Sequence, residues 1–326
     1  MKKYTKISMP NIDSKIWDLE YKIMDLLEKL LSGNDIVLSL NNEGICAEAV
    51  GLYKLLDQLC TKFNIDPQRI IISTANALEK SQRHKIVYSD LVYLAKYKQI
   101  NFDDCKVFDN RLKHFGIFIG RSNWNRLFLT ATIFKNYKEK SILSFHYNLD
   151  TKENNCGFDE LTHYIGVGET VDLCYDLLKA FPIKLDEVDS YPILDPAHLN
   201  ILKYYNTIFL DVVCETYFTG NTFYPTEKTA RPILAKTPFL NFGPTNFLSN
   251  MKKLGFKTFN NYWSEDYDNY NGIYRAQKIV EILEQLSNKP LDELKDMYSD
   301  MLPILEHNKS RMKELTMPKF YDTFKT

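Results

Sequence analysis

The chain has 326 residues, which fits two packed lobes of roughly 100 to 200 residues each, or one enlarged α/β domain. Hydrophobic residues make up 44% and charged residues 25% of the chain, and these proportions exclude a disordered or fibrous protein. The 41 basic and 42 acidic residues leave a net charge of -1. The chain as a whole therefore lacks the basic field of a non-specific nucleic-acid binder.

Cysteine usage and the amino-terminal segment indicate a reducing compartment. Six cysteines stand singly along the chain, without a CxxC pair, and we interpret them as reduced and mostly buried thiols. The basic start of the chain is interrupted by Pro10, Asn11 and Asp13, so we predict no signal peptide. No run of eighteen apolar residues occurs, so no membrane span is expected and the predicted location is cytoplasmic.

The first third of the chain alternates helical and strand patterns. Ser14 is a candidate N-cap for a helix that places apolar residues at helical spacing from Ile16 to Leu30 and stops at Gly33. Further helices are expected from Leu52 to Phe63 and over 75–82. Short apolar runs predict strands at 35–40, 69–74 and 85–88.

The rest of the chain repeats this alternation. Strands are expected at 115–120, 141–145, 207–213 and 238–242, and helices at 124–137 and from about residues 226, 245, 272 and 291. The stretch from 146 to 200 is read as mixed helix and loop. The pattern predicts an α/β protein with two Rossmann-like lobes facing a cleft. We expect an acceptor-side lobe at 1–108, a donor lobe at 109–300 and a helical tail at 301–326.

The most informative stretch runs from the strand at 207–213 to the helix expected at Thr226. The strand delivers the carboxylate of Glu215 at its end, and Thr226 is positioned to cap the helix that carries Glu227 and Lys228. The amino end of a helix with a nearby lysine can bind a diphosphate. A carboxylate such as Glu227 can accept hydrogen bonds from both hydroxyls of a ribose. The alternative is that Glu227 and Lys228 only cap the helix.

These residues resemble the donor site of the α-1,3-fucosyltransferase family. The resemblance covers about 207–243 and consists of a strand ending in Glu215-Thr216, the motif Tyr224-Pro225-Thr226-Glu227-Lys228, and the strand Thr237-Pro238-Phe239 followed by Gly243. A weaker likeness upstream is the turn Gly120-Arg121-Ser122-Asn123, which precedes Arg126. Glu215-Thr216 stands where the family has Glu-Asn-Ser, and the family's acceptor-side landmarks are not evident.

The resemblance implies a GT-B glycosyltransferase whose carboxyl-terminal lobe binds a nucleotide sugar, usually GDP-fucose. Glu227 would bind the ribose and Lys228 the diphosphate, with Arg121 or Arg126 on the same phosphates. Tyr224, with Phe223 beside it, could stack on a nucleobase or simply pack in the core. The residues themselves support metal-independent transfer, because cations and a helix terminus can neutralise a leaving diphosphate. No cofactor is required in this reading.

An inverting transfer to a hydroxyl, of a glycan for example, needs a general base. Glu43, in the turn after the strand at 35–40, is the first candidate and equally fits a first-turn helix residue without a chemical role. His146, after the strand at 141–145, is the second candidate, although a lone histidine near a strand end is more often a packed or surface residue. The tripeptide Asp266-Tyr267-Asp268 resembles the Asp-x-Asp motif of metal-binding sites. We interpret its two carboxylates as solvated or helix-capping groups.

Two other classes of function remain open from the sequence. One is a non-catalytic module that binds a nucleotide or nucleotide sugar without transferring it. The other is a glycosyltransferase that acts on modified nucleic acid, which the near-zero net charge does not favour. The sequence does not specify the donor base, the acceptor or the oligomeric state.

Overall fold

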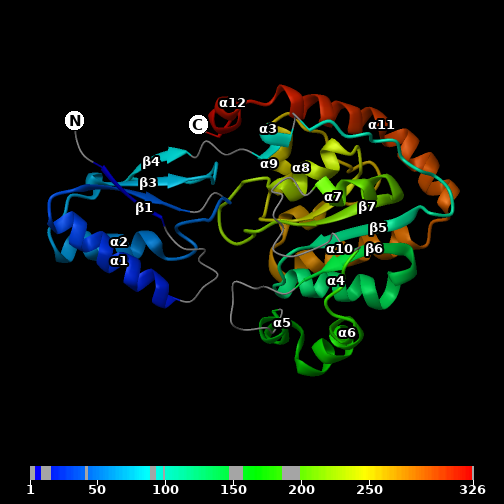
Figure 1. The fold of residues 1–326 in the computed structure, drawn as a ribbon, viewed down its shortest axis with the longest axis horizontal. Coiled ribbons are helices and arrows are strands. Elements are labelled where there is room, and N and C mark those ends of the chain that lie inside the picture. The colour runs from blue at the N-terminus through cyan, green and yellow to red at the C-terminus, as the bar shows by residue number, and fades with distance from the viewer. Residues whose placement is uncertain are drawn as a thin grey trace. The chain divides into compact units, whose positions relative to one another are not determined.

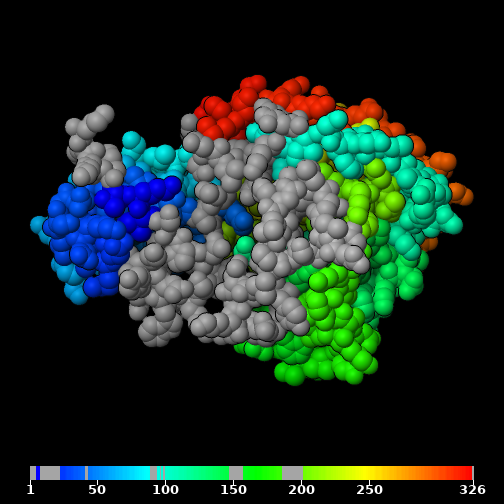
Figure 2. All heavy atoms as spheres, viewed as in Figure 1, coloured from blue at the N-terminus to red at the C-terminus, as the bar shows by residue number. Residues whose placement is uncertain are grey.

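The computed structural model describes residues 4–8, 16–40, 43–88, 93–97, 100–146, 157–185 and 199–324. The remaining residues are drawn in grey in Figure 1 and Figure 2, and the expected N-cap Ser14 and Cys156 are among them. The chain forms two compact units. Unit 1 contains residues 1–92, 216–226 and 316–326, and unit 2 contains residues 93–215 and 227–315.

Unit 1 is built on a four-stranded parallel sheet in which the strands lie side by side in chain order (Figure 1). The strands are β1 (Tyr4–Ser8), β2 (Asp35–Ser39), β3 (Ile70–Thr74) and β4 (Lys85–Tyr88). Its helical elements are α1 (Ile16–Leu31), α2 (Leu52–Lys62), the 3-10 turn η1 (Pro67–Arg69) and α12 (Met317–Asp322). The strand β1 was not expected, because its residues were interpreted as part of a basic amino-terminal segment.

The core of unit 1 follows from the apolar periodicity of its sequence. Leu26 and Leu30 of α1 are buried together with Ile36 and Leu38 of β2 and Leu56 of α2. Side chains of β2 alternate between buried and half-buried, as expected for a strand that packs helices mainly on one face. The predicted helix and strand at 16–40 are therefore confirmed.

The helix expected over 75–82 is wrong. This segment is a turn in which Oδ1 of Asn76 accepts a hydrogen bond from Leu78 N at 3.0 Å. The backbone N–H of Ala77 donates to Phe223 O at 3.1 Å instead of joining a helix. The polar side chain of Asn76 thus competes with helical hydrogen bonding, which is why asparagine favours turns.

Unit 2 contains a second four-stranded parallel sheet, but its strand order is different. The strands are β5 (Lys113–Ile119), β6 (Ser141–Phe145), β7 (Ile208–Cys214) and β8 (Phe239–Phe242). They lie in the order β6-β5-β7-β8, so the chain moves outward from β5 in both directions. The reversal between β5 and β7 is a topological switch point.

Helices cover both faces of this sheet (Figure 1). On one face lie α4 (Trp124–Tyr137) and α10 (Gly272–Ser287), and on the other α8 (Glu227–Leu234), α3 (Tyr93–Tyr97) and α11 (Leu291–Glu314). The remaining elements of unit 2 are α5 (Phe158–Ile165), α6 (Val167–Lys179), α7 (Leu199–Leu202), α9 (Phe247–Lys253), η2 (Lys138–Lys140), η3 (Lys203–Thr207) and η4 (Asp266–Asn269).

The helix α4 is buried on all sides. Every side chain from Trp124 to Phe134 is buried, because α4 lies between β6 and the helices α5, α6 and α10. A helix whose residues are buried all round belongs to the interior of a domain. The amino end of α4 is thereby held firmly at the edge of the sheet.

The expected fold class is confirmed, since each unit is an α/β layer structure with a parallel sheet. The units are interleaved in sequence, whereas the lobes expected at 1–108 and 109–300 were contiguous. The expected tail at 301–326 begins inside α11. That the lobes face a cleft stays a prediction.

Between β6 and β7 the sequence predicted only mixed helix and loop, and the described part contains the helices α5 and α6. This segment, green in Figure 2, lies on the surface and exposes Val167, Val171 and Tyr175. Within the described residues, no helix has the length and apolar character needed to cross a membrane. The five described cysteines carry free thiols, and only Cys105 among them is exposed.

Candidate functional site

The carboxyl edge of the unit 2 sheet gathers polar residues at its switch point. Arg121 and Ser122 follow β5, and Glu215 follows the neighbouring strand β7. In open parallel sheets, ligands bind outside the carboxyl ends of the strands where the strand order reverses. This edge is therefore the place in unit 2 where topology favours a ligand.

Arg126 lies in the first turn of α4 at this edge. Asn123 caps the helix by accepting a hydrogen bond from Arg126 N at 3.2 Å, as asparagine commonly does at helix starts. The Arg126 guanidinium donates from Nη1 to Arg121 O at 2.8 Å and from Nη2 to Glu215 O at 3.3 Å. These bonds join the ends of β5 and β7, and only 6% of Arg126 is exposed.

Among the described residues, the buried charge of Arg126 has no carboxylate partner, because its acceptors are backbone carbonyls. Its Nε, Ser122 Oγ and Asn125 Nδ2 are all buried without a hydrogen-bond partner. Buried charges are normally paired, and buried donors are normally satisfied. The start of α4 therefore combines a positive charge and three unused donor groups with the positive end of the helix dipole.

Arg121 and Arg126 were left open as alternative phosphate ligands, and their environments differ. Arg121 is exposed, whereas Arg126 is buried in the first turn of α4. A buried guanidinium lies in a region of lower dielectric constant, where its attraction for an anion is stronger than at the surface. The geometry favours Arg126.

Glu215 is buried and connects β7 to α8. Thr229 Oγ1 donates to Glu215 Oε1 at 2.5 Å, and Asn241 Nδ2 donates to Thr229 Oγ1 at 3.1 Å. The carboxylate therefore helps to fix the first turn of α8 against the end of the strand. Sequence analysis assigned Glu215 to donor binding, and this contact adds a positioning role.

Thr226 directly precedes α8, which begins at Glu227 as expected. The side chains of Glu227 and Lys228 form an ion pair with 2.6 Å between Oε1 and Nζ. Both are largely buried, at 9% and 18% exposed. The two charges predicted to bind ribose and diphosphate thus contact one another, and a ligand that engages either must compete with this pair.

The charges of α4 and α8 act on the same strand end. Burial raises the pKa of the Cys214 thiol to about 12, while the nearby positive charges of Arg126 and Lys228 oppose this rise. Both cations are therefore close enough to the end of β7 to influence a group there. The carboxylates of Asp211 and Glu215 act on the same thiol in the opposite sense, so cations and carboxylates meet at this strand end.

His146, the second candidate base, lies at the same edge of unit 2. It directly follows β6, and its backbone N–H donates to Ile119 O of β5 at 3.2 Å. Its side chain is buried, with 4% exposed. The structure thus places His146 at the carboxyl end of β6, next to β5.

Glu43, the first candidate base, lies in unit 1 in the turn after β2. The alternative that Glu43 belongs to the first turn of a helix is wrong, because α2 begins only at Leu52. Its neighbour Gly44 has φ of +83° and approaches Tyr224 so closely that an added Cβ would lie 2.4 Å from Tyr224 Cβ. The turn that carries Glu43 therefore packs directly on Tyr224.

Tyr224 and Phe223 are buried in unit 1. The Tyr224 ring meets Phe320 edge-on at 6.4 Å, and Phe223 packs on Phe320 and Phe324. Only 4% of Tyr224 is exposed. These contacts match the core-packing alternative, and a stacking role of Tyr224 on a nucleobase stays a prediction.

Sequence analysis missed a polar network that holds residues 216–226 on unit 1. Asn76 Oδ1 accepts from Phe223 N at 2.9 Å, and Asn76 Nδ2 donates to Asn221 O at 3.0 Å and to Glu79 Oε2 at 3.1 Å. Glu79 also accepts from Ala47 N at 3.1 Å. The only available signal was a polar Asn-x-x-Glu pattern after a strand, which we had read as helix.

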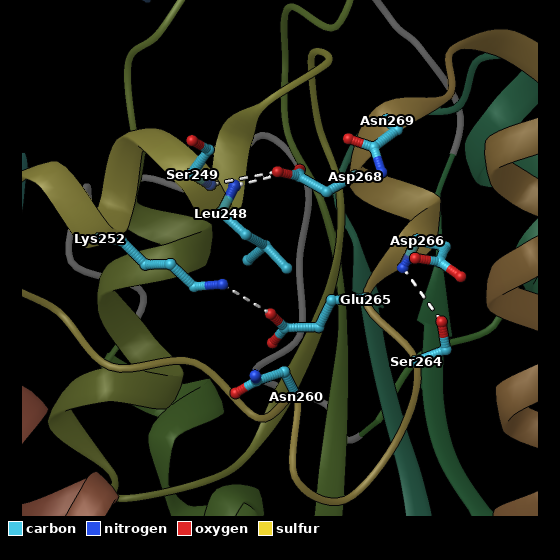
Figure 3. Close-up of a pocket in the computed structure, with 9 residues that line it drawn as sticks. All are labelled: Leu248, Ser249, Lys252, Asn260, Ser264, Glu265, Asp266, Asp268 and Asn269. Atoms are coloured by element: carbon cyan, nitrogen blue, oxygen red, sulfur yellow. Dashed lines mark hydrogen bonds and ion pairs between the residues drawn. The ribbon is translucent and has the colours of Figure 1, made fainter.

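The Asp266-Tyr267-Asp268 motif has the structural role that we expected. The Asp268 carboxylate accepts from Leu248 N at 3.0 Å and Ser249 N at 3.1 Å at the start of α9 (Figure 3). It also pairs with Arg275 at 3.1 Å. Within the described residues, no group of three or more His, Cys, Asp or Glu side chains is arranged to hold a metal ion.

Comparison with known proteins gives distant structural likenesses. No protein-family model and no curated protein sequence matches the chain. The α,α-trehalose 6-phosphate synthase of Burkholderia multivorans is 12% identical, with a TM-score of 0.45 over 99% of this chain and 69% of that one. The UDP-forming α,α-trehalose-phosphate synthase of Burkholderia xenovorans is 11% identical, with a TM-score of 0.40 over 99% and 74%.

A third solved structure is that of a trehalose-6-phosphate synthase, an enzyme of glycosyl transfer with retention. It is 11% identical, with a TM-score of 0.39 over 90% of this chain and 70% of that one. With TM-scores below 0.5, these likenesses carry no argument about function.

Proposed function

We propose that the protein is a glycosyltransferase of the GT-B type that binds a nucleoside-diphosphate sugar at the carboxyl edge of the unit 2 sheet. The observation that carries the proposal is Arg126, a buried guanidinium without a carboxylate partner among the described residues. An anionic ligand would supply the missing partner, and a diphosphate bears the charge and acceptor oxygens that the start of α4 lacks.

Glu227 and Lys228 would complete the donor site from the start of α8. Their ion pair would open when the ribose hydroxyls engage Glu227 and the phosphates engage Lys228. This exchange replaces one charge-assisted contact with two. The proposed donor is GDP-fucose or a related nucleotide sugar, as the resemblance to the α-1,3-fucosyltransferase family implies.

The proposed reaction is one in-line displacement. The acceptor hydroxyl oxygen forms a bond to the anomeric carbon, while the bond from that carbon to the diphosphate oxygen breaks. The leaving diphosphate takes the bonding electron pair, and Arg126 and Lys228 stabilise its charge without requiring a metal. Glu43 or His146 accepts the hydroxyl proton. This path inverts the anomeric configuration.

Calorimetric titration of GDP and UDP into the full chain tests donor binding. Arg126→Met should weaken binding by about 1.5–3 kcal/mol, the range for hydrogen bonds to charged groups. Arg121→Met is the matched control and should leave the affinity within about twofold, because an exposed cation contributes little. Arg126→Lys keeps the charge without the planar fork and should fall between them.

Because Arg126 also bonds to backbone carbonyls, each variant needs a melting temperature without ligand. A folded Arg126→Met protein that binds both nucleotides like the wild type would overturn the assignment. Binding of nucleotide without transfer to any hydroxyl acceptor would instead indicate the non-catalytic module. NMR of the anomeric configuration of the product distinguishes inversion from retention.

A further inference from the structure

A cavity of about 390 Å³ opens on unit 2 between α9 and η4 (Figure 3). Its volume falls within the roughly 300–1,000 Å³ of small-molecule sites. Leu248 is the one apolar residue in its lining, and the other lining side chains are charged, amide or hydroxyl groups. The cavity can therefore form hydrogen bonds to a ligand from several sides.

Two of the three carboxylates that line the cavity, Asp268 and Glu265, are held in fixed positions by hydrogen bonds. Asp268 is held by Arg275 and by the backbone N–H groups at the start of α9. Glu265 accepts from Phe259 N at 2.7 Å and from Thr258 Oγ1 at 2.8 Å. Such supporting bonds preorganise polar groups for binding.

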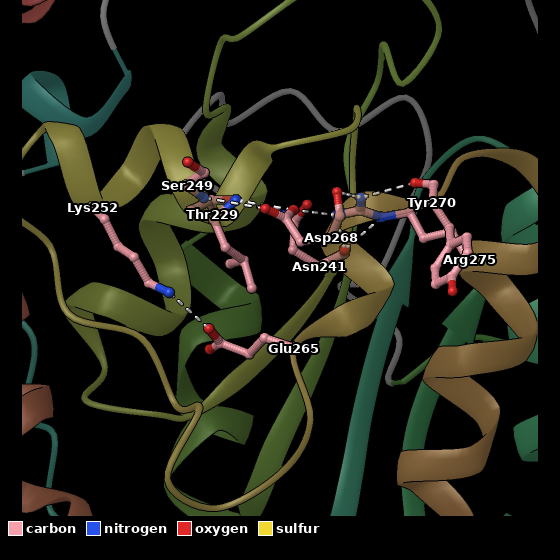
Figure 4. Close-up of polar contacts among 9 residues, drawn as sticks. Thr229, Asn241, Ser249, Lys252, Glu265, Asp268, Tyr270 and Arg275 are labelled. Atoms are coloured by element: carbon pink, nitrogen blue, oxygen red, sulfur yellow. Dashed lines mark hydrogen bonds and ion pairs between the residues drawn. The ribbon is translucent and has the colours of Figure 1, made fainter.

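A chain of polar contacts runs from the same wall through Arg275 to Asn241 and Thr229 (Figure 4). Arg275 donates from Nη2 to Asn241 O at 2.9 Å, and Asn241 Nδ2 donates to Thr229 Oγ1, which in turn donates to Glu215. The cavity is therefore built on rigid elements of unit 2, outside the switch point itself.

The charges of the lining disfavour an ionic ligand, and its shortage of apolar surface disfavours a flat aromatic one. The carboxylates of Glu265, Asp266 and Asp268 repel an anion. The Lys252 ammonium lies 3.2 Å from Glu265, and Arg275 neutralises Asp268, so of the three carboxylates only Asp266 is left to attract a cation. A nucleobase would need apolar faces on which to stack. A neutral ligand whose groups both donate and accept hydrogen bonds fits this lining.

We propose that this cavity binds a sugar residue, a neutral and hydroxyl-rich ligand, at a site separate from the switch point. Asn260 and Asp266 are exposed in the lining, and among the described residues their side chains make no hydrogen bond to another group. They supply the amide and carboxylate that bind the sugar hydroxyls. A fixed sugar site on unit 2 gives the protein a means of holding a glycan independently of donor binding.

Saturation-transfer NMR on the full chain tests the proposal. The probes are the methyl glycosides of glucose, galactose, mannose, fucose and N-acetylglucosamine, each measured with excess GDP and UDP present to fill a donor site. At least one glycoside should bind the wild type. Asn260→Ala and Asp266→Ala should each weaken that binding roughly 2- to 10-fold, the effect of losing one hydrogen bond.

Asn261→Ala is the matched control, because Asn261 is an exposed neighbour outside the lining, and it should bind like the wild type. The proposal is overturned if no glycoside binds, if nucleotide displaces the glycoside, or if both lining variants bind unchanged. Failure of nucleotide binding in the calorimetric test leaves this result unaffected, so the two proposals can fail separately.

Discussion

Units 1 and 2 contain parallel sheets of the same number of described strands, yet only one of them has a switch point. In unit 1 the strands follow the order β1-β2-β3-β4, whereas in unit 2 the order is β6-β5-β7-β8. Loops after strands that lead in opposite directions diverge and leave room for a ligand. Strand order, rather than sheet composition, is therefore the reason for proposing the donor site in unit 2.

The carboxyl edges of the two sheets also satisfy their polar groups differently. In unit 1, Asn76 at the end of β3 bonds to residues 221–223 of the same chain. In unit 2, Ser122, Asn125 and Arg126 retain buried donor atoms without partners. Unit 1 therefore fills its edge with its own backbone, while unit 2 leaves buried donor atoms at its edge without partners among the described residues.

The largest expected effect comes from the glycine that packs on the amino end of α4. A Cβ on Gly157 would lie 2.2 Å from Trp124 N, and its φ is +86°. Gly157→Ala should cost about 3 kcal/mol through backbone strain and overpacking. By displacing α4, it should also reduce the thermal stabilisation produced by GDP.

Gly33→Ala in unit 1 is the matched control, since φ is +91° there but no atom lies within 4 Å of the added Cβ. It should cost about 1 kcal/mol from strain alone. Urea unfolding measures both variants, and equal losses would show that the start of α4 tolerates displacement.

A smaller effect is expected at the edge of unit 1. Asn76→Ala leaves Phe223 N, Asn221 O and Glu79 with fewer partners and should destabilise the protein by about 2 kcal/mol. Amide exchange measured by mass spectrometry should increase in peptides covering 216–226. Nucleotide affinity should change less than in Arg126→Met.

Asn76→Asp provides a control for charge and shape. It retains the acceptor for Phe223 N but places a carboxylate beside Glu79, so it should also destabilise. Adding Glu79→Gln should recover part of that loss, because the amide can donate to the new carboxylate. Additive losses in the double variant would contradict the network.

The pH dependence of stability compares a buried histidine from each unit. Burial lowers the pKa of His84 in unit 1 and of His114 in unit 2. Below the unfolded-state pKa of about 6.5, the unfolded chain binds these protons first. The stabilisation that each neutral, buried histidine contributes should therefore be complete above that value. The free energy of unfolding should fall as the pH drops from there through each folded-state pKa.

His84→Asn and His114→Gln separate the two contributions. The asparagine amide can replace Nδ1 as a donor to Pro67 O, and the glutamine amide can replace Nε2 as a donor to Lys289 O, and neither amide titrates. Each variant should flatten the decline measured by urea unfolding between about pH 7 and pH 5. An unchanged slope in both would mean that other groups govern acid unfolding.

The smallest effects are expected for exposed ion pairs in either unit. Arg83 and Asp57 in unit 1 are 45% and 41% exposed, and Lys135 and Asp172 in unit 2 are 36% and 80% exposed. Arg83→Ala and Lys135→Ala should each change the free energy of unfolding by less than about 1 kcal/mol. A larger loss in thermal or urea unfolding would indicate a packing role for either side chain.

Much of the fold could be predicted because apolar periodicity is local. The run Ile70-Ile71-Ile72 indicates a buried strand, and the repeating leucines of α2 indicate an amphipathic helix. The segment at 75–82 could not be predicted, because the partner of Asn76 lies at 221–223 and long-range contacts override local propensity.

The candidate site was predictable in part for the same reason. The start of α8 at Glu227 follows from a local motif, but the Glu227–Lys228 ion pair and the burial of Arg126 depend on packing. The choice between Arg121 and Arg126 required knowing which of them is buried, which sequence does not give. For Tyr224 the sequence left open a ligand-facing or a packed ring, and its contacts with Gly44 and Phe320 indicate a packed position.

The interleaving of the two units restricts how the gene can be divided. Residues 216–226 and 316–326 belong with residues 1–92. A truncation after residue 92 would therefore remove the backbone at 221–223 that Asn76 binds, together with the packed rings of Phe223 and Phe320. A chimera that replaces one half of this protein must therefore exchange all three segments together. Recombination at a single crossover would yield two incomplete halves.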